Sequence, residues 1–148
     1  MSKLDQEQLI GIVISSHGGL AQALLDSAEM IIGEQDNVVA VSLDPQDNLD
    51  TLQAALNAAV DEADRGLGVI ILIDLFGGTP GHAAALCVGR RKLPAVSGVN
   101  LPMLLEIIMS RRVLSLDELS KRGLKSGTEG VVDIALRVRE SIYSSKPD

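Results

Sequence analysis

Residues 68–80 read GVIILIDLFGGTP, a β-branched run that leads through an aspartate and a glycine pair into a Thr-Pro step. A short apolar run bounded by glycine predicts a buried strand. We expect Thr79 to cap the following helix, because Pro80 fits the first helical position, where a missing N–H does no harm. The segment therefore predicts a strand, a glycine turn and a helix in succession.

The same succession recurs along the rest of the chain. Residues 9–19, LIGIVISSHGG, also pass from an apolar run into a glycine pair. The expected strands are 9–15, 38–43, 68–74 and 93–96, and helices are expected to begin near residues 20, 49, 80, 101 and 116. Strands that alternate with helices predict an α/β fold with a single doubly wound, mostly parallel sheet and helices on both faces. A brief run at 131–134 predicts a final strand without an identifiable pairing partner.

The composition excludes several classes of function. The chain has no Trp and only Phe76 and Tyr143 as aromatic residues, so it cannot build the stacking platform that sugars and single-stranded nucleic acids require. A net charge of −7 also disfavours a nucleic-acid partner, since phosphate backbones are met by clustered Lys and Arg. Cys87 has no second cysteine to pair with, residues 1–8 are too polar for a signal peptide, and no apolar run approaches a membrane-spanning length. We therefore expect a cytoplasmic protein that does not insert into a membrane.

The two glycine loops are the candidate site. Ligands of parallel α/β sheets bind beyond the carboxyl ends of the strands, where the loops after residues 15 and 73 lie. Each loop combines flexible glycines with a helix start, which favours anions. Neither loop contains G-x-x-x-x-G-K-S/T or G-x-G-x-x-G, so we predict no nucleotide cofactor, and we predict no metal.

His17, in the first loop, is the candidate reactive residue at this edge. A neutral imidazole is a good nucleophile at cytoplasmic pH, and phosphorus bound to its nitrogen remains transferable. Asp74, at the end of the neighbouring apolar strand, is expected to fix the ring. The amides of Gly77 and Gly78 and the hydroxyl of Thr79 are the expected donors to a phosphoryl group.

Each of these residues also has a purely structural interpretation. A lone histidine in a turn is usually solvated, Asp74 could serve as a turn former, and capping alone explains Thr79. His82, in the first turn of the third helix, is either an accessory phosphate contact or an ordinary exposed residue.

Four segments, at 12–18, 28–34, 73–80 and 98–104, match the sequence of a known protein family in order and at similar spacing. From Leu9 to Ile134 the chain resembles the IIA domain of the mannose family of the bacterial phosphoenolpyruvate-dependent sugar phosphotransferase system. The resemblance implies a domain over 9–136, flanked by a polar lead at 1–8 and a polar tail at 137–148. It also implies a homodimer in which a C-terminal strand near 131–136 is exchanged between subunits.

The resemblance further implies roles and partners. His17 would be the phosphorylated histidine, Asp74 would orient it and Thr79 would lie beside the phosphate. Phosphoryl would arrive from the phosphocarrier protein HPr and pass to a IIB component. One departure is His82, which stands where family members often carry an amide.

Two rival functions remain open at this point. A stand-alone member could act as a regulator whose phosphorylation state is sensed by another protein. A histidine-dependent phosphatase is disfavoured because such enzymes place an Arg immediately before the nucleophilic His, whereas this chain has Ser16.

Overall fold

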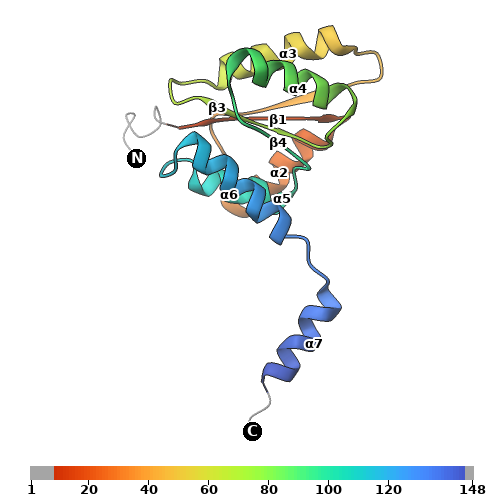
Figure 1. Cartoon of the computed structure of the whole chain (residues 1–148), viewed down its shortest axis with the longest axis vertical. Coiled ribbons are helices and arrows are strands. Elements are labelled where there is room, and N and C mark those ends of the chain that lie inside the picture. The colour runs from red at the N-terminus through yellow and green to blue at the C-terminus, as the bar shows by residue number, and fades with distance from the viewer. Residues whose placement is uncertain (1–8, 146–148) are drawn as a thin grey trace.

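Four parallel strands form the sheet of the computed structural model, which describes residues 9–145 (Figure 1). The strands are β1 (Gly11–His17), β2 (Val38–Leu43), β3 (Val69–Ile73) and β4 (Ala95–Ser97). They lie in the order β2-β1-β3-β4, and each neighbouring pair is parallel. The predicted parallel sheet is confirmed, and the carboxyl ends of all its strands share one edge. β4 begins two residues later than the predicted run at 93–96.

Helices cover both faces of the sheet, as predicted (Figure 1). The helices are α2 (Leu20–Ile32), α3 (Leu49–Ala63), α4 (Gly78–Arg91), α5 (Leu101–Ser110), α6 (Leu116–Glu129) and α7 (Ile134–Ser144). Helices α3 and α4 bury their apolar residues against one face, and α2, α5 and α6 bury theirs against the other. The alternating side chains of β1 supply both cores, because Val13 faces the first and Ile14 the second.

The buried face of α2 differs from the expected one. The sequence pattern predicts one apolar stripe along this helix, made of Leu20, Ala23, Leu24, Ser27, Ala28 and Ile31. Ala28 is buried as predicted, but Leu20 and Ile31 are exposed, and Ala21 and Leu25 are the other buried residues. The spacing of the three buried residues, four and then three positions, is also helical, so small alanines left the phase of this helix ambiguous in the sequence.

Side-chain caps fix the starts of four helices: Asn48 caps α3, Asn100 caps α5, Ser115 caps α6 and Asp133 caps α7. Asn100 accepts a hydrogen bond from the Met103 amide at 3.0 Å, and Ser115 and Glu118 form the capping box that their three-residue spacing predicts. The predicted cap of α4 is wrong, because the helix begins at Gly78 and its N-cap is Gly77, which has no side chain. Thr79 therefore lies inside the first turn of α4.

The C-terminal segment also differs from the prediction. Residues 131–133 form no strand, and Asp133 caps α7 by accepting a hydrogen bond from the Leu136 amide at 3.0 Å. The segment at 131–136, for which the resemblance implied an exchanged strand, thus ends in a helix. Residues 137–144 of the expected polar tail belong to α7, which extends away from the sheet (Figure 1). The expected polar lead lies outside the described residues.

A buried cation ties α5 to the opposite end of the sheet from the carboxyl edge. Arg111 is 3% exposed, and its guanidinium donates to the backbone carbonyls of Ile10, Asp36 and Asn37. Burial lowers the pKa of Arg111 to about 10, so the group stays charged at neutral pH. These bonds hold the start of β1 beside the loop that enters β2.

Candidate functional site

His17 is the last residue of β1, and its side chain is 48% exposed at the carboxyl edge. Its ring nitrogen Nδ1 lies 2.9 Å from Oδ2 of Asp74. Its backbone N–H donates to the same oxygen, also at 2.9 Å. Because β1 and β3 are parallel neighbours, the ends of the two strands meet here, and the predicted pairing of these side chains is present.

The Asp74 carboxylate determines which nitrogen of the ring carries the proton. Burial disfavours its charge, but the hydrogen bonds from His17 and from the Leu75 amide outweigh burial and lower the pKa of Asp74. An ionised carboxylate only accepts hydrogen bonds, so Nδ1 must be the donor. In the neutral ring, Nε2 then keeps its lone pair free for reaction.

The second glycine loop lies beside that free nitrogen. Gly77 and Gly78 have φ values of 113° and 64°, in the left-handed region that side chains rarely adopt. A Cβ atom placed on Gly78 would lie 3.5 Å from Nε2 of His17. Nε2 therefore faces the start of α4, whose first N–H groups have no acceptor within the helix. Thr79 follows, half-buried in the same turn.

The first glycine loop brings a second helix start to His17. Gly18, with φ of 54°, donates its N–H to the Leu43 carbonyl at 2.9 Å, which ties the turn to the end of β2. The α2 helix then begins at Leu20 without a side-chain cap on Gly19. Two helix N-termini, each with partial positive charge, thus lie at the same edge as the imidazole.

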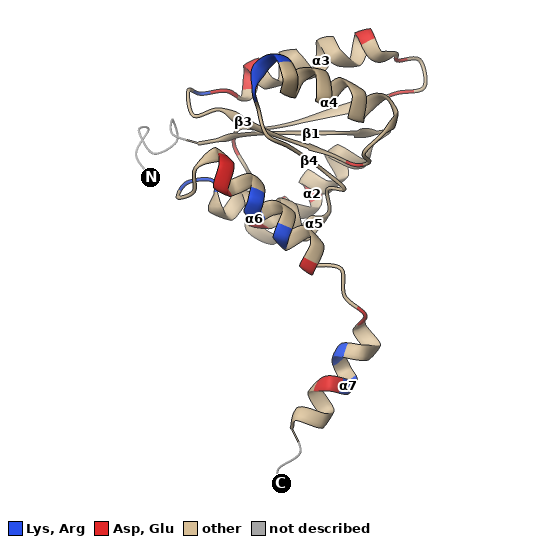
Figure 2. Cartoon of the chain, in the orientation of Figure 1, with Lys and Arg blue, Asp and Glu red and all other residues tan. Residues whose placement is uncertain are grey.

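No lysine or arginine occurs in the loops at this edge, at residues 17–20, 43–50, 74–80 and 98–102. Figure 2 shows acidic positions and no basic ones at the arrowhead ends of the strands. Arg90 and Arg91 lie at the far end of α4, where Arg91 pairs with Asp61. Donors for an anion in these loops are therefore uncharged groups such as backbone amides, hydroxyl groups and side-chain amides.

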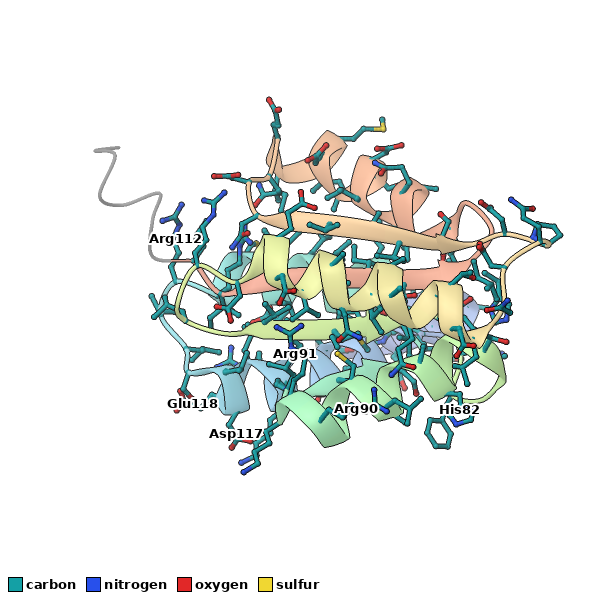
Figure 3. The ribbon with its side chains drawn as sticks, turned by 90° about the horizontal axis from the view of Figure 1, so that it is seen from above. His82, Arg90, Arg91, Arg112, Asp117 and Glu118 are labelled. Carbon is teal, nitrogen blue, oxygen red and sulfur yellow. The ribbon has the colours of Figure 1, made fainter. Side chains whose placement is uncertain are left out.

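The structure groups three predicted site residues directly: His17, Asp74 and Gly78. Gly77 caps the adjoining helix, and within the described chain no hydrogen bond joins the Thr79 hydroxyl to His17 or Asp74. His82 is exposed and projects from the outer side of α4 (Figure 3). Sequence reasoning missed Ser16, whose buried hydroxyl accepts a hydrogen bond from the Ala21 amide at 2.7 Å. A serine directly before the His-Gly-Gly turn was the available signal.

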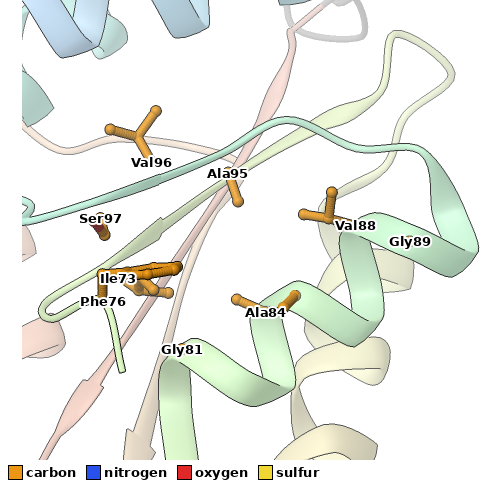
Figure 4. A pocket seen from close by; sticks show the side chains of 10 residues that line it. Ile73, Phe76, Gly81, Ala84, Val88, Gly89, Ala95, Val96 and Ser97 are labelled. Carbon is orange, nitrogen blue, oxygen red and sulfur yellow. The ribbon is translucent and has the colours of Figure 1, made fainter. Parts of the chain in front are cut away.

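An apolar groove lies next to the site, between α4 and the edge strand β4 (Figure 4). Its volume is about 340 Å³. Phe76, which is 82% exposed, stands at the groove together with Ala84, Val88 and Val96. Residues 9–145 contain neither a cluster of metal-ligating side chains nor a helix long and apolar enough to cross a membrane.

Sequence comparison shows that the chain is similar to proteins of one family. A family model described as "PTS system fructose IIA component" matches residues 11–123. The chain is 38% identical to the PTS system fructose-specific EIIA component of Bacillus subtilis over 141 residues, covering 95% of this chain and 96% of that protein. It is 41% identical to the mannose-specific EIIAB component of Escherichia coli over 124 residues, covering 82% of this chain but only 38% of that protein.

Solved structures agree with the sequence comparisons. The mannose/sorbose-specific IIA subunit from Enterococcus faecalis superimposes with a TM-score of 0.77 at 35% identity, covering 85% of this chain and 95% of that one. The EIIA component from Streptococcus agalactiae gives a TM-score of 0.78 at 32% identity, with coverage of 86% and 99%.

Proposed function

Because the chain belongs to the mannose- and fructose-type IIA family of the bacterial sugar phosphotransferase system, we propose that it carries a phosphoryl group on Nε2 of His17. The observation that supports this most directly is the 2.9 Å contact between Nδ1 and the Asp74 carboxylate. It occupies one ring nitrogen and directs the lone pair of the other toward the glycine loop.

The proposed reaction is an in-line transfer between histidines. The lone pair on Nε2 attacks the phosphorus atom of a phosphohistidine on HPr, and the N–P bond of that donor breaks with its electron pair returning to the donor ring. Nδ1 keeps its proton, and Asp74 stabilises the positive charge that develops on the His17 ring. The same steps in reverse pass the group to a IIB component.

Charge on the phosphoryl oxygens needs hydrogen-bond donors on this chain. A phosphoryl group adds about −1.5 to −2 charges at pH 7, at an edge whose loops contain no lysine or arginine. In our proposal the amides of Gly77 and Gly78 and the hydroxyl of Thr79 donate to these oxygens. The N-terminus of α4 adds its partial positive charge.

Two further assignments accompany the carrier role. We propose that the phosphoryl transfer takes place in the cytoplasm, because Cys87 is a buried free thiol in a chain that cannot form an intrachain disulfide. We also propose a homodimer in which the segment 131–144 of one copy packs into the groove beside β4 of the other. The support is that β4 is an edge strand and that α7 has no buried residue in the single chain.

The test is the intact mass of the protein after incubation with phosphoenolpyruvate, enzyme I and HPr. The parent should gain one acid-labile phosphoryl group, and His17→Ala should gain none. His82→Ala is the matched control, since it removes the other histidine of the chain and should be labelled like the parent. The rate at which Asp74→Ala is labelled should be about one tenth of the parent rate or lower, because the ring is no longer held.

Either of two results would contradict the proposal. One is an unlabelled parent in a reaction where HPr is labelled. The other is a phosphoryl group that persists on His17→Ala, which would place the acceptor elsewhere.

A further inference from the structure

Two adjacent serines immediately precede His17 in β1, and their hydroxyl groups differ in one respect. Both Ser15 and Ser16 are completely buried. The Ser15 hydroxyl has no hydrogen-bond partner in the described part of the chain. The Ser16 hydroxyl contacts one backbone group of the turn that follows and one of the first turn of α2. Their different surroundings follow from strand geometry, which points successive side chains to opposite faces of the sheet.

The Ser16 hydroxyl bridges the turn that carries His17. Its oxygen accepts the Ala21 N–H at 2.7 Å, and its proton points toward the Gly18 carbonyl at 3.4 Å. Ala21 lies in the first turn of α2, where an N-cap side chain would ordinarily accept such an N–H. Gly19 occupies the N-cap position and has no side chain, so Ser16 replaces the missing cap from within the strand.

This arrangement links three parts of the site. The hydroxyl joins the end of β1 to the first turn of α2, and the His17-Gly18-Gly19 turn lies between them. On its other side the turn is held by Gly18, whose N–H bonds to the end of β2. Gly18 has a φ of 54° and no side chain, so the turn is restrained by these bonds and by the bond from the His17 backbone N–H to Asp74.

We propose that Ser16 is a positioning residue for phosphoryl transfer: its hydroxyl fixes the turn so that the His17 ring meets both Asp74 and the start of α4. The kinetic part of this inference rests on the proposed phosphocarrier function. Displacing a reacting group by about 1 Å can cost a hundredfold in rate, so a modest loosening of the turn has a measurable effect.

The first test uses the unphosphorylated protein and does not depend on the proposed function. ¹⁵N NMR signals of the ring report the tautomer of His17, which the parent should hold with the proton on Nδ1. In Ser16→Ala the ring signals should move toward those of a free, exchanging imidazole. Ser15→Ala is the matched control, because it removes a neighbouring buried hydroxyl that has no hydrogen-bond partner among residues 9–145, and its ring signals should match the parent.

The second test measures the transfer rate from phosphorylated HPr. Ser16→Ala should lower kcat about tenfold while the KM for HPr stays within about twofold, since the docking surface is unchanged. Ser15→Ala should keep the parent kcat. If Ser16→Ala does not fold, Ser16→Cys replaces it: the thiol has a similar size but is a weak acceptor, and it should give the same ring and kcat changes in smaller degree.

Parent-like ring signals together with a parent-like kcat in a folded Ser16 variant would overturn the inference. Equal losses in Ser15→Ala and Ser16→Ala would also overturn it, because they would assign the effect to strand packing. If the parent accepts no phosphoryl group, the proposed function fails, while the ring signals still decide the role of Ser16.

Discussion

Asp74 accepts three hydrogen bonds with one carboxylate. Oδ2 accepts the backbone N–H and the ring Nδ1 of His17, and Oδ1 accepts the Leu75 amide. The side chain is only 11% exposed, so these bonds offset the loss of solvent around its charge. In the proposed mechanism, the stability and the reactivity of this edge therefore depend on the same ionised group.

The first prediction concerns the pH dependence of stability. The pKa of Asp74 is lowered from its ordinary value of 3.8, so the unfolded chain binds the proton more readily than the folded chain. The stabilisation from this carboxylate is therefore fully present above that value and is lost as pH falls through the lowered pKa. Urea unfolding should be measured for the parent and for Asp74→Asn from about pH 7 to about pH 3. The free energy of unfolding of the parent should exceed that of the variant by an amount that decreases as the pH falls. A constant difference across that range would mean that the charge of Asp74 contributes nothing.

The two central residues of the site were predictable, but their supports were not. Parallel strands end at one edge, so an aspartate and a histidine at the ends of neighbouring strands had to lie close together. Ser16 escaped prediction because its role depends on a bond across five residues between strand and helix, which no periodicity reveals. Which ring nitrogen is free also required the structure, because the answer depends on the position of Oδ2.

Among the elements, α5 and α6 approach each other through a glycine. A Cβ on Gly123 of α6 would lie within 3 Å of both Cδ1 and Cγ1 of Ile107 in α5. Glycine weakens a helix interior relative to alanine, so its presence here reflects the close packing of the two helices. Gly89 of α4 offers a contrast, since a Cβ there would meet nothing within 4 Å.

These two glycines should respond oppositely to the same substitution. Gly123→Ala should lower the free energy of unfolding by about 1–3 kcal/mol, because Ile107 must move out of a well-packed site. Gly89→Ala should raise it by about 0.5–1 kcal/mol through helix propensity alone. Chemical denaturation of both variants beside the parent provides the measurement, and a stabilised Gly123→Ala would show that α5 and α6 yield more easily than their packing indicates.

Element types were predicted better than element boundaries. The capping box at Ser115 was predictable because a serine and a glutamate stand three residues apart, which is the spacing that the motif requires. At α4 the Thr-Pro signal was misleading, since two glycines with positive φ turn the chain into the helix before Thr79. At 131–134 the β-branched residues favoured a strand. In the structure, Asp133 instead caps a helix, so the aspartate was the more informative residue of this segment.

At the scale of the molecule, α7 is the part of the described chain whose apolar side chains pack least. Ile134, Val138 and Ile142 are each more than half exposed, and their spacing of four residues puts them on one side of the helix. The α4–β4 groove is the corresponding uncovered apolar surface on the sheet. A second copy would cover both at once, which motivates the proposed homodimer.

Light scattering after gel filtration tests that assembly. The parent should elute with twice the mass of one chain, and Val138→Asp/Ile142→Asp should shift it toward the monomer, because two charges would enter an apolar contact. Glu140→Lys is the control, since it changes a charge on the opposite side of α7 and should leave the dimer intact. A parent that is monomeric at all concentrations, or a double variant that remains dimeric, would refute the arrangement.

The order of strands in the sheet also bears on how the protein is made. β1 lies at the centre of the sheet but is translated first, and its second neighbour β3 follows only after β2 and α3 have been synthesised. His17 and Asp74 are separated by 57 positions in the chain. A nascent chain emerging from the ribosome therefore displays its histidine well before the aspartate that holds it. Completion of the site coincides with closure of the central strand pair, so a chain interrupted within the first three elements keeps an imidazole that nothing aligns.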